Sequence, residues 1–317
     1  MVRVYVTRDI SSPILQPLND KFDVELWVGD EPVPREELLA RASVAEGLLC
    51  MLNDVIDVAL LDASPFLRVV SQMAVGVDNV DLAECSKRGI AVGHTPGVLT
   101  ETVADTAFAL LGAVVRRLPE GEREVRDGAW GPWSPFRLAG GDLHGTTLGI
   151  VGMGRIGRAL ARRAQGFAMS VVYSSPSAAS GVDAERLELE RMLEVADNVV
   201  ICATLTDETR GLIGELELGR MKRSACLVNV ARGPIVDTDA LVAALGAGEI
   251  AGAGLDVTDP EPIPSSHPLL AFANCLVVPH IGSASVETRR AMAGLAVKNL
   301  VNGLEGQPMP ARYPTGG

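Results

Sequence analysis

A glycine-rich segment near the middle of the chain has the residue types and spacing that bind the phosphates of a dinucleotide. The apolar run Leu148–Val151 predicts a buried strand, and residues 152–157 follow it with the spacing G-x-G-x-x-G before a predicted helix. There Gly152 permits a tight turn, Gly154 lets the backbone approach a pyrophosphate, and Gly157 lets the helix pack closely on the strand. The first N–H groups of the helix would then face the anion. A turn without a ligand is the alternative, which the flanking strand and helix disfavour.

The residues after the next predicted strand bear on the choice between NAD and NADP. An acidic side chain about 20 residues beyond the first glycine would bind the ribose 2′-hydroxyl of NAD. The chain has Tyr173-Ser174-Ser175-Pro176 there instead. The hydroxyls of Ser174 and Ser175 could donate to a 2′-phosphate, although no arginine stands at this position. The sequence therefore favours NADP(H), with NAD(H) as the alternative.

The elements that must position these loops alternate along the chain. Short apolar runs predict buried parallel strands at Val2–Val6, Gly47–Met51, Leu67–Ser71, Leu148–Val151, Ser170–Tyr173, Asn198–Ala203, Cys226–Asn229, Gly252–Asp256 and Cys275–Val278. Helix patterns lie at Gly157–Gly166, Asp239–Ala247 and Ser285–Asn302, and Ser285 is placed to cap the last of these. Alternating strands and helices predict the α/β class with parallel sheets.

Two turn-rich segments predict where the chain crosses between domains. They are His94–Gly97 and Pro279–Ser283. With crossings there, residues 98–284 form a dinucleotide-binding domain, which is inserted into a substrate domain made of residues 1–97 and 285–317. We expect a ligand to bind in the cleft between two such domains.

Composition disfavours several classes of function. With 28 Lys and Arg against 40 Asp and Glu, the net charge of −12 would repel nucleic acid. We find no apolar run near the roughly 20 residues of a membrane helix and no signal-peptide pattern at the start, so we expect a cytoplasmic protein without membrane partners. The five cysteines are scattered in apolar surroundings, which predicts buried, reduced thiols and no metal site.

Three further segments narrow the prediction, namely Val228–Gly233, Gly254–Pro262 and Val278–Ser283. With the glycine loop and Met73–Asn79, their order and spacing resemble the signatures of the D-isomer-specific 2-hydroxyacid dehydrogenases over essentially the whole chain. Within that family the chain is most similar to glyoxylate and hydroxypyruvate reductases, through Gly47–Leu52, Trp130–Trp133, Leu255–Thr258 and Gly306–Pro310. The resemblance implies two Rossmann-like domains and the NAD(P)H-dependent reduction of small 2-keto acids to 2-hydroxy acids by hydride transfer.

The resemblance also assigns catalytic roles to Arg232, Glu261 and His280. Reducing a 2-keto acid requires a hydride on the carbonyl carbon, a proton on its oxygen and a cation to hold the carboxylate. His280 would be the general acid and Glu261 its partner, because a carboxylate hydrogen-bonded to an imidazolium favours the charged form. Arg232 would hold the carboxylate and polarise the ketone oxygen. Singly, Arg232 could be a surface or salt-bridged arginine, Glu261 an exposed loop residue and His280 a satisfied core histidine. The ordered set with the glycine loop makes coincidence improbable.

Further contacts follow from the same resemblance. The substrate-binding residues would be Leu52, Val75, Gly76, Trp133 and Arg232, with the N–H groups of Val75 and Gly76 on the carboxylate. The cofactor-binding residues would be Gly152, Met153, Gly154, Arg155, Ile156, Gly157, Ser174, Ser175, Thr204, Thr209, Val230, Asp256, His280 and Gly282. Among these, Asp256 would hold the nicotinamide carboxamide and Val230 would border the nicotinamide.

Segment Asp127–Phe136 is polar and broken by prolines, yet it holds two of the three tryptophans. Such aromatic side chains need burial, which their own loop could provide. The resemblance implies instead an arm exchanged across a two-fold homodimer, in which Trp133 reaches the substrate pocket of the other copy and limits the size of the keto acid.

Two other functions stay open at this point. Relatives of this fold serve as NAD(H)-sensing corepressors, so a binding protein is one alternative. A phosphoglycerate dehydrogenase is the second, although the chain reaches Gly317 without the appended regulatory domain that is common there. A hydrolase is a weaker hypothesis than either of these, because the sequence has no G-x-S-x-G nucleophile elbow. A turnover assay with glyoxylate separates the enzyme from the sensor.

Overall fold

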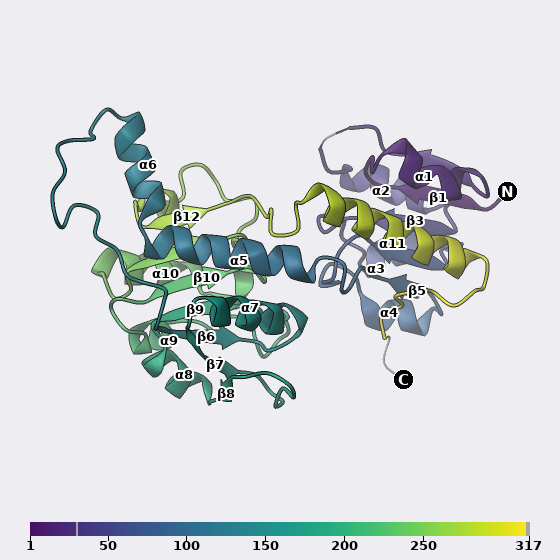
Figure 1. Cartoon of the computed structure of the whole chain (residues 1–317). Coiled ribbons are helices and arrows are strands. Elements are labelled where there is room, and N and C mark those ends of the chain that lie inside the picture. The colour runs from purple at the N-terminus through teal and green to yellow at the C-terminus, as the bar shows by residue number, and fades with distance from the viewer. Residues whose placement is uncertain (30, 315–317) are drawn as a thin grey trace. The chain divides into compact units, whose positions relative to one another are not determined.

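A computed structural model describes residues 1–29 and 31–314, which divide into two compact units (Figure 1). The first unit comprises Met1–Leu99 and Ser285–Gly317, and the second comprises Thr100–Ala284. Within the described residues, no helix has the length and apolar character needed to cross a membrane.

The first unit is built on a five-stranded parallel sheet with the order β2-β1-β3-β4-β5. Its strands are β1 (Arg3–Val6), β2 (Asp23–Leu26), β3 (Gly47–Cys50), β4 (Val69–Gln72) and β5 (Ala91–Gly93). Strands β3 and β4 are buried at every residue, because helices cover both faces of the sheet. Helices α1 (Ser12–Asn19) and α11 (Val286–Leu304) pack on one face, while α2 (Arg35–Ala42), α3 (Val58–Ala63) and α4 (Leu82–Lys87) pack on the other.

Helix α11 brings the last part of the chain back onto the first sheet. It begins as predicted, because the Ser285 hydroxyl accepts the Thr288 N–H at 3.1 Å. Beyond it, the chain runs antiparallel to β5 with a bridge between Gly93 and Arg312. The Tyr313 N–H donates to the Val92 carbonyl at 2.7 Å. The exposed edge of β5 is thus covered by the C-terminal segment.

The second unit contains a seven-stranded parallel sheet with the order β12-β11-β10-β9-β6-β7-β8. Its strands are β6 (Thr147–Val151), β7 (Ser170–Ser174), β8 (Glu185–Arg186), β9 (Asn198–Ile201), β10 (Cys226–Asn229), β11 (Gly252–Leu255) and β12 (Cys275–Val277). The order reverses at β6, which pairs with β7 on one side and with β9 on the other. In open α/β sheets the carboxyl ends of the strands at such a reversal are where ligands bind.

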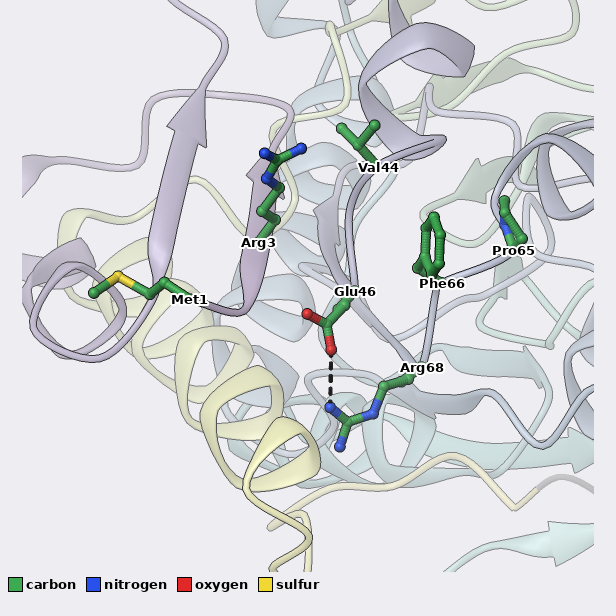
Figure 2. Close-up of a pocket in the computed structure, with 7 residues that line it drawn as sticks. All are labelled: Met1, Arg3, Val44, Glu46, Pro65, Phe66 and Arg68. Carbon is green, nitrogen blue, oxygen red and sulfur yellow. Dashed lines mark hydrogen bonds and ion pairs between the residues drawn. The ribbon is translucent and has the colours of Figure 1, made fainter.

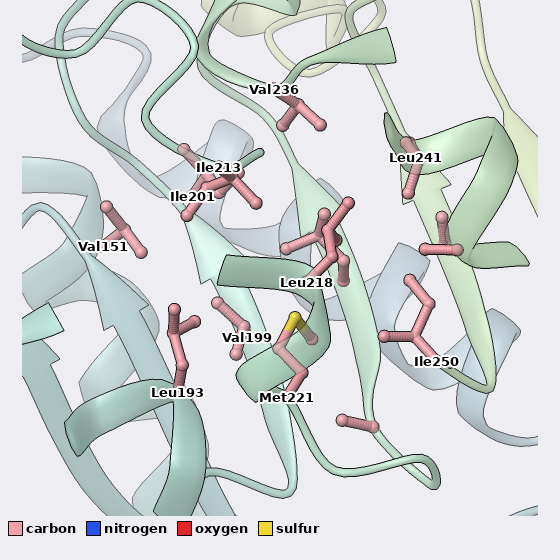
Figure 3. Close-up of a cluster of buried hydrophobic side chains, with 14 of the residues drawn as sticks. Val151, Leu193, Val199, Ile201, Ile213, Leu218, Met221, Val236, Leu241 and Ile250 are labelled. Carbon is pink, nitrogen blue, oxygen red and sulfur yellow. The ribbon is translucent and has the colours of Figure 1, made fainter. Parts of the chain in front are cut away.

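Helices cover both faces of this second sheet as well. Helix α5 (Thr100–Val115) packs on β10, β11 and α7 (Arg155–Gly166). On the other face, α8 (Leu189–Val195), α9 (Glu215–Arg220) and α10 (Thr238–Ala247) enclose an apolar core. In Figure 3, Val199 and Ile201 of β9 lie among Leu193, Leu218 and Met221 from the covering segments. This core fixes the strand ends that carry the loops considered below.

The α/β class with two parallel, helix-covered sheets is confirmed, and every predicted strand and helix is present. Three strands were missed. β2 has no fully buried residue, β5 is three residues long, and β8 is two exposed residues, so none has the apolar run that identified the others.

The prediction of buried thiols holds for four cysteines and is wrong for Cys202, which is only partly buried at the carboxyl end of β9. All five are free thiols.

A segment of the second unit extends away from its sheet (Figure 1). It consists of α6 (Leu118–Arg126), which has no buried residue, and the loop that follows. Trp130, Trp133 and Phe136 on this loop are 74%, 85% and 87% exposed. In a single copy of the chain, therefore, these aromatic side chains do not pack under their own loop.

Candidate active site

The glycine loop after β6 has the form that a dinucleotide phosphate requires. Gly152 has a φ of +93°, and a Cβ there would lie 2.7 Å from the Ala203 Cα in the loop after β9. Any residue other than glycine is therefore disfavoured at this position for two reasons, the positive φ and the steric clash of its Cβ with Ala203. At Gly154, by contrast, a Cβ would have no described heavy atom within 4 Å, so the backbone is open to an approaching group. Helix α7 begins directly after it, and its free N–H groups favour an anion.

The loop after β7 is where the ribose 2′-phosphate of NADP or the ribose 2′-hydroxyl of NAD would lie. Ser174 and Ser175 stand at its start, partly exposed, and the Ser174 carbonyl accepts the Gly152 N–H at 2.8 Å. The Arg186 guanidinium donates to the carbonyls of Ser175 and Pro176 at 2.9 and 3.1 Å. An arginine is thus present beside the two serines, which sequence reasoning missed. It lies on the short strand β8, and linear spacing gave no signal for it.

Three loops at the carboxyl ends of neighbouring strands carry the predicted catalytic residues. Arg232 follows β10, Glu261 lies in the loop after β11, and His280 follows β12. The first two loops are locked together at Gly233, where a Cβ would come within 1.9 Å of the Thr258 carbonyl oxygen. Only glycine permits this approach. The structure therefore explains the glycine after Arg232 by packing rather than by contact with a ligand.

His280 and Glu261 form a hydrogen-bonded pair. The Nδ1 of His280 lies 2.6 Å from the Glu261 Oε1, so Nδ1 carries the proton of this bond and Nε2 is left for a ligand. The other oxygen of Glu261 accepts the Thr258 N–H at 3.4 Å. Burial opposes the ionisation of Glu261, but the hydrogen bond and charge of His280 and the charge of Arg232 together hold its pKa below the ordinary value. The ionised carboxylate thus accepts the bond from Nδ1 and holds the imidazole in one orientation.

Asp256 shapes the loop that carries His280. Its carboxylate is 2% exposed and accepts the N–H groups of Ile281 and Gly282 at 2.7 and 2.9 Å. Its backbone carbonyl accepts the His280 N–H at 2.9 Å. Burial raises the pKa of Asp256 although these bonds favour its charge. His280 itself has a φ of +51°, which a non-glycine residue rarely adopts and which such bonds must maintain.

Arg232 stands on a loop that is held by a buried asparagine. The Asn229 side chain, 1% exposed, donates to the Arg232 carbonyl at 2.9 Å and accepts the Ala231 N–H at 3.0 Å. The Arg232 guanidinium is partly exposed and donates to the Ala231 carbonyl at 2.8 Å. Asn229 belongs to the sequence motif but had no predicted role, and the structure shows that it fixes the turn.

The other predicted residues of the second unit lie on loops at the same edge of the sheet. Val230 is 7% exposed directly after β10. In the loop after β9 the Thr209 hydroxyl donates to the Thr204 carbonyl at 2.7 Å, which closes the turn on which both residues stand. Trp133, on the extended loop, does not join this group within one copy of the chain.

The predicted substrate residues of the first unit lie on two loops that a polar network joins. Leu52 follows β3, and Val75 and Gly76 follow β4. The Asn79 amide donates to the Met51 and Asp54 carbonyls at 3.1 and 2.7 Å, and so ties the second loop to the first. These loops all lie at the carboxyl edge of the first sheet.

The opposite edge of that sheet has a surface pocket without predicted site residues (Figure 2). It is lined by Arg3, Glu46 and Arg68, which begin or precede β1, β3 and β4, and by the exposed Phe66. The pocket therefore lies at the amino ends of the strands, whereas ligands of open α/β sheets bind at the carboxyl ends. The Arg68 and Glu46 side chains in it pair with each other at 3.1 Å.

The fold and the site together define a dinucleotide-binding α/β protein with a paired histidine and carboxylate. Residues 108–282 match the model of the D-isomer specific 2-hydroxyacid dehydrogenase, NAD binding domain. The chain belongs to this family, as the sequence predicted. It is 47% identical to a glyoxylate reductase of Korarchaeum cryptofilum, covering 97% of this chain and 94% of the relative. It is 44% identical to the human glyoxylate reductase/hydroxypyruvate reductase, covering 98% and 97%.

A solved structure shares the complete architecture. The crystal structure of an NADPH-dependent glyoxylate/hydroxypyruvate reductase from Sinorhizobium meliloti, in complex with NADP and malonate, is 36% identical and has a TM-score of 0.88. The match covers 99% of this chain and 97% of the other. The match therefore extends over both units of this chain, each of which has one parallel sheet.

Proposed function

We propose that this protein reduces small 2-keto acids, with glyoxylate and hydroxypyruvate as substrates, to the corresponding 2-hydroxy acids. The observation that carries the proposal is the pair of His280 and Glu261, 2.6 Å apart, on a unit with a dinucleotide-binding loop. A proton donor of this kind serves a reaction in which a carbonyl becomes a hydroxyl. Relatives that cover nearly the whole chain are named for the same two substrates.

In this proposal each residue of the site has a defined role. A bound nicotinamide supplies the hydride to the carbonyl carbon. His280 donates a proton from Nε2 to the carbonyl oxygen, and Glu261 holds the imidazole through Nδ1 and stabilises its charge. Arg232 binds the substrate carboxylate and polarises the ketone. The N–H groups of Val75 and Gly76 also bind the carboxylate, and Leu52 borders it.

For the cofactor we propose a preference for NADP(H) over NAD(H). Ser174 and Ser175 offer hydroxyl donors without a carboxylate to repel a 2′-phosphate, and Arg186 adds a positive charge beside them. The glycine loop residues 152–157, the turn of Thr204 and Thr209, Val230, Asp256 and Gly282 would form the rest of the site. Asp256 can still accept from a carboxamide, because each carboxylate oxygen has a further lone pair.

We propose a homodimer built on the extended segment of the second unit. Its exposed side chains Trp130, Trp133 and Phe136, with Leu118 and Val125 of α6, need cover that one copy does not provide. In an exchanged arm, Trp133 would reach the substrate site of the second copy. Sedimentation at micromolar concentration tests the dimer, and a changed preference between hydroxypyruvate and bulkier keto acids in Trp133→Ala tests the contact.

For the location of the protein we propose the cytoplasm, because the free thiols suit a reducing compartment.

The deciding experiment is steady-state turnover of glyoxylate, hydroxypyruvate, pyruvate and phenylpyruvate with NADPH and with NADH. We expect reduction of the two small substrates, with the higher kcat/KM for NADPH. Binding of cofactor without turnover of any keto acid would contradict the proposal and favour a dinucleotide sensor. A wide preference for NADH would contradict the cofactor assignment alone.

A further inference from the structure

Two backbone N–H groups in the first unit, those of Val75 and Gly76, are proposed above to bind the substrate carboxylate. Backbone donors cannot be aimed by a side-chain rotamer, so their direction depends on what holds the rest of each peptide group. In a trans peptide the C=O and the N–H point in opposite directions. The partner of a carbonyl oxygen therefore determines where the N–H of the same peptide group points.

Both carbonyls behind these N–H groups are held by one short segment, His94 and Thr95 after β5. The Val75 N–H shares its peptide group with the Ala74 carbonyl, which accepts the Thr95 N–H at 2.7 Å. The Gly76 N–H shares its peptide group with the Val75 carbonyl, which lies 3.0 Å from the Nδ1 of His94. Because a carbonyl oxygen only accepts, Nδ1 of His94 is the donor.

His94 is fixed in turn by the C-terminal part of the chain. The Asn299 amide of α11 donates to the His94 carbonyl at 2.8 Å, and the His94 N–H donates to the Ala311 carbonyl at 3.0 Å. Asn299 is wholly buried and also accepts the Ala311 N–H at 2.9 Å. The Tyr313 ring meets the imidazole edge to face, with centroids 4.9 Å apart. The histidine ring therefore has a defined position from which to donate.

We infer that His94 is a positioning residue for substrate binding, which through Nδ1 directs and strengthens the Gly76 N–H as a donor to the carboxylate. A carbonyl that accepts a hydrogen bond polarises its peptide group, and the opposite N–H becomes a better donor. Held in advance, such a donor needs no reorganisation when an anion binds. The inference rests on the proposed carboxylate site and goes beyond it, because it assigns His94 a function through the backbone.

Three substitutions at His94 separate the hydrogen bond from packing. Asparagine places an amide donor where Nδ1 stands, so His94→Asn should retain the bond. Glutamine places its amide near the position of Nε2 instead, and leucine fills space without a donor. We expect KM for glyoxylate to rise about tenfold in His94→Leu and His94→Gln with kcat changed much less, because carboxylate binding acts equally in the ground and transition states. His94→Asn should stay close to wild type. His144→Leu, at an exposed loop histidine, is the matched control.

Inhibition by oxalate, a dicarboxylate of the size of glyoxylate, gives a second measurement that depends on the carboxylate site. The Ki of oxalate should rise in parallel with the KM for glyoxylate. The His94→Leu and His94→Asn variants, by contrast, should have the same KM for NADPH and the same melting temperature. Equal KM and Ki in all variants, or equal impairment of the asparagine and leucine variants, would overturn the inference. If wild-type protein reduces no keto acid, the proposed function fails, and calorimetric binding of oxalate to wild type and His94→Leu still decides the role of His94.

Discussion

The two units offer a ligand different kinds of groups at the carboxyl edges of their sheets. In the second unit the reactive groups are ionisable side chains, His280, Glu261 and Arg232, whose partners adjust their charge. In the first unit the groups that we propose are the backbone N–H groups of Val75 and Gly76, which only a proline substitution removes and whose direction depends on neighbouring residues. The comparison teaches that side-chain chemistry can be changed residue by residue, whereas backbone donors are best tested through the groups that support them.

Replacing the proton donor should give the largest effect. We expect His280→Ala to lower kcat on the order of a hundredfold or more, because proton transfer acts in the transition state. Binding of NADPH, followed by fluorescence, should change little. Activity equal to wild type would remove His280 from the mechanism. It would also contradict the view that the second unit acts through ionisable side chains.

Glu261→Gln sharpens the same test through pH. The pKa of Glu261 is lowered in the folded protein, so its carboxylate stays ionised as pH falls past the usual pKa of 4.5. The ion pair with His280 is lost only when pH falls below the lowered pKa. Glutamine keeps the shape but has no charge to stabilise an imidazolium. The variant should therefore have a lower kcat than wild type at neutral pH, and this difference should narrow only as pH falls below 4.5 and the wild-type carboxylate is protonated. Superimposable kcat profiles would contradict the role of the charge.

Removing a support in the first unit should affect stability more than chemistry. The Asn79 amide joins the loops of Leu52 and Val75 by donating to two backbone carbonyls. Asn79→Ala leaves these acceptors without their donor and should lower the free energy of unfolding by about 2 kcal/mol, measured by urea denaturation. Asn53→Ala, at an exposed neighbouring position, is the control. A loss of kcat as large as that of His280→Ala would contradict the distinction between the units.

Cofactor preference provides a smaller, purely electrostatic test within the second unit. Ser174→Asp puts a carboxylate where it would repel a 2′-phosphate and accept from a 2′-hydroxyl. We expect the ratio of kcat/KM for NADPH to that for NADH to fall about tenfold, with the same keto acid throughout. Ser177→Asp, farther along the exposed loop, is the matched control. An unchanged ratio would show that the loop after β7 does not contact the ribose.

The same comparison explains what could be predicted from the sequence. Buried strands and the glycine loop could be predicted because apolar runs and motif spacing are local in the chain, whereas Arg232, Glu261 and His280 were assigned through the resemblance of their motifs to a known family. The roles of Asn229, Arg186 and His94 could not, since each depends on segments that only the fold brings together. Asp256 shows an intermediate case, because its position in a motif was evident, whereas its bonds to the backbone of Ile281 and Gly282 were not. The short strands β2, β5 and β8 lack the apolar periodicity on which strand prediction depends.

Two buried tyrosines extend the comparison to the cores of the units and give the smallest expected effect. Tyr173 of β7 is 3% exposed, and its hydroxyl accepts the Ala179 N–H at 2.9 Å. Tyr5 of β1 is 2% exposed, and its hydroxyl has no hydrogen-bond partner among the described residues. Removing a paired hydroxyl loses a bond, whereas removing an unpaired one relieves a desolvation cost. At pH 7, Tyr173→Phe should therefore lower the free energy of unfolding by about 1 kcal/mol, and Tyr5→Phe should raise it by up to about 1 kcal/mol.

Alkaline pH should enlarge the difference at Tyr5. Burial, with the charges of Glu37 and Glu25, raises the pKa of Tyr5 to about 12 from an ordinary value of 10.0. A group whose folded pKa is raised contributes stability that is complete below the unfolded pKa and is lost as pH rises through the folded value. Between these values the unfolded chain ionises first, so wild-type protein should lose stability there and Tyr5→Phe should lose less. Urea denaturation of both proteins at pH 7 and about pH 11 measures this. A Tyr5→Phe protein that is less stable than wild type at both values would mean that the hydroxyl is bonded, because only a lost hydrogen bond would then explain the destabilisation.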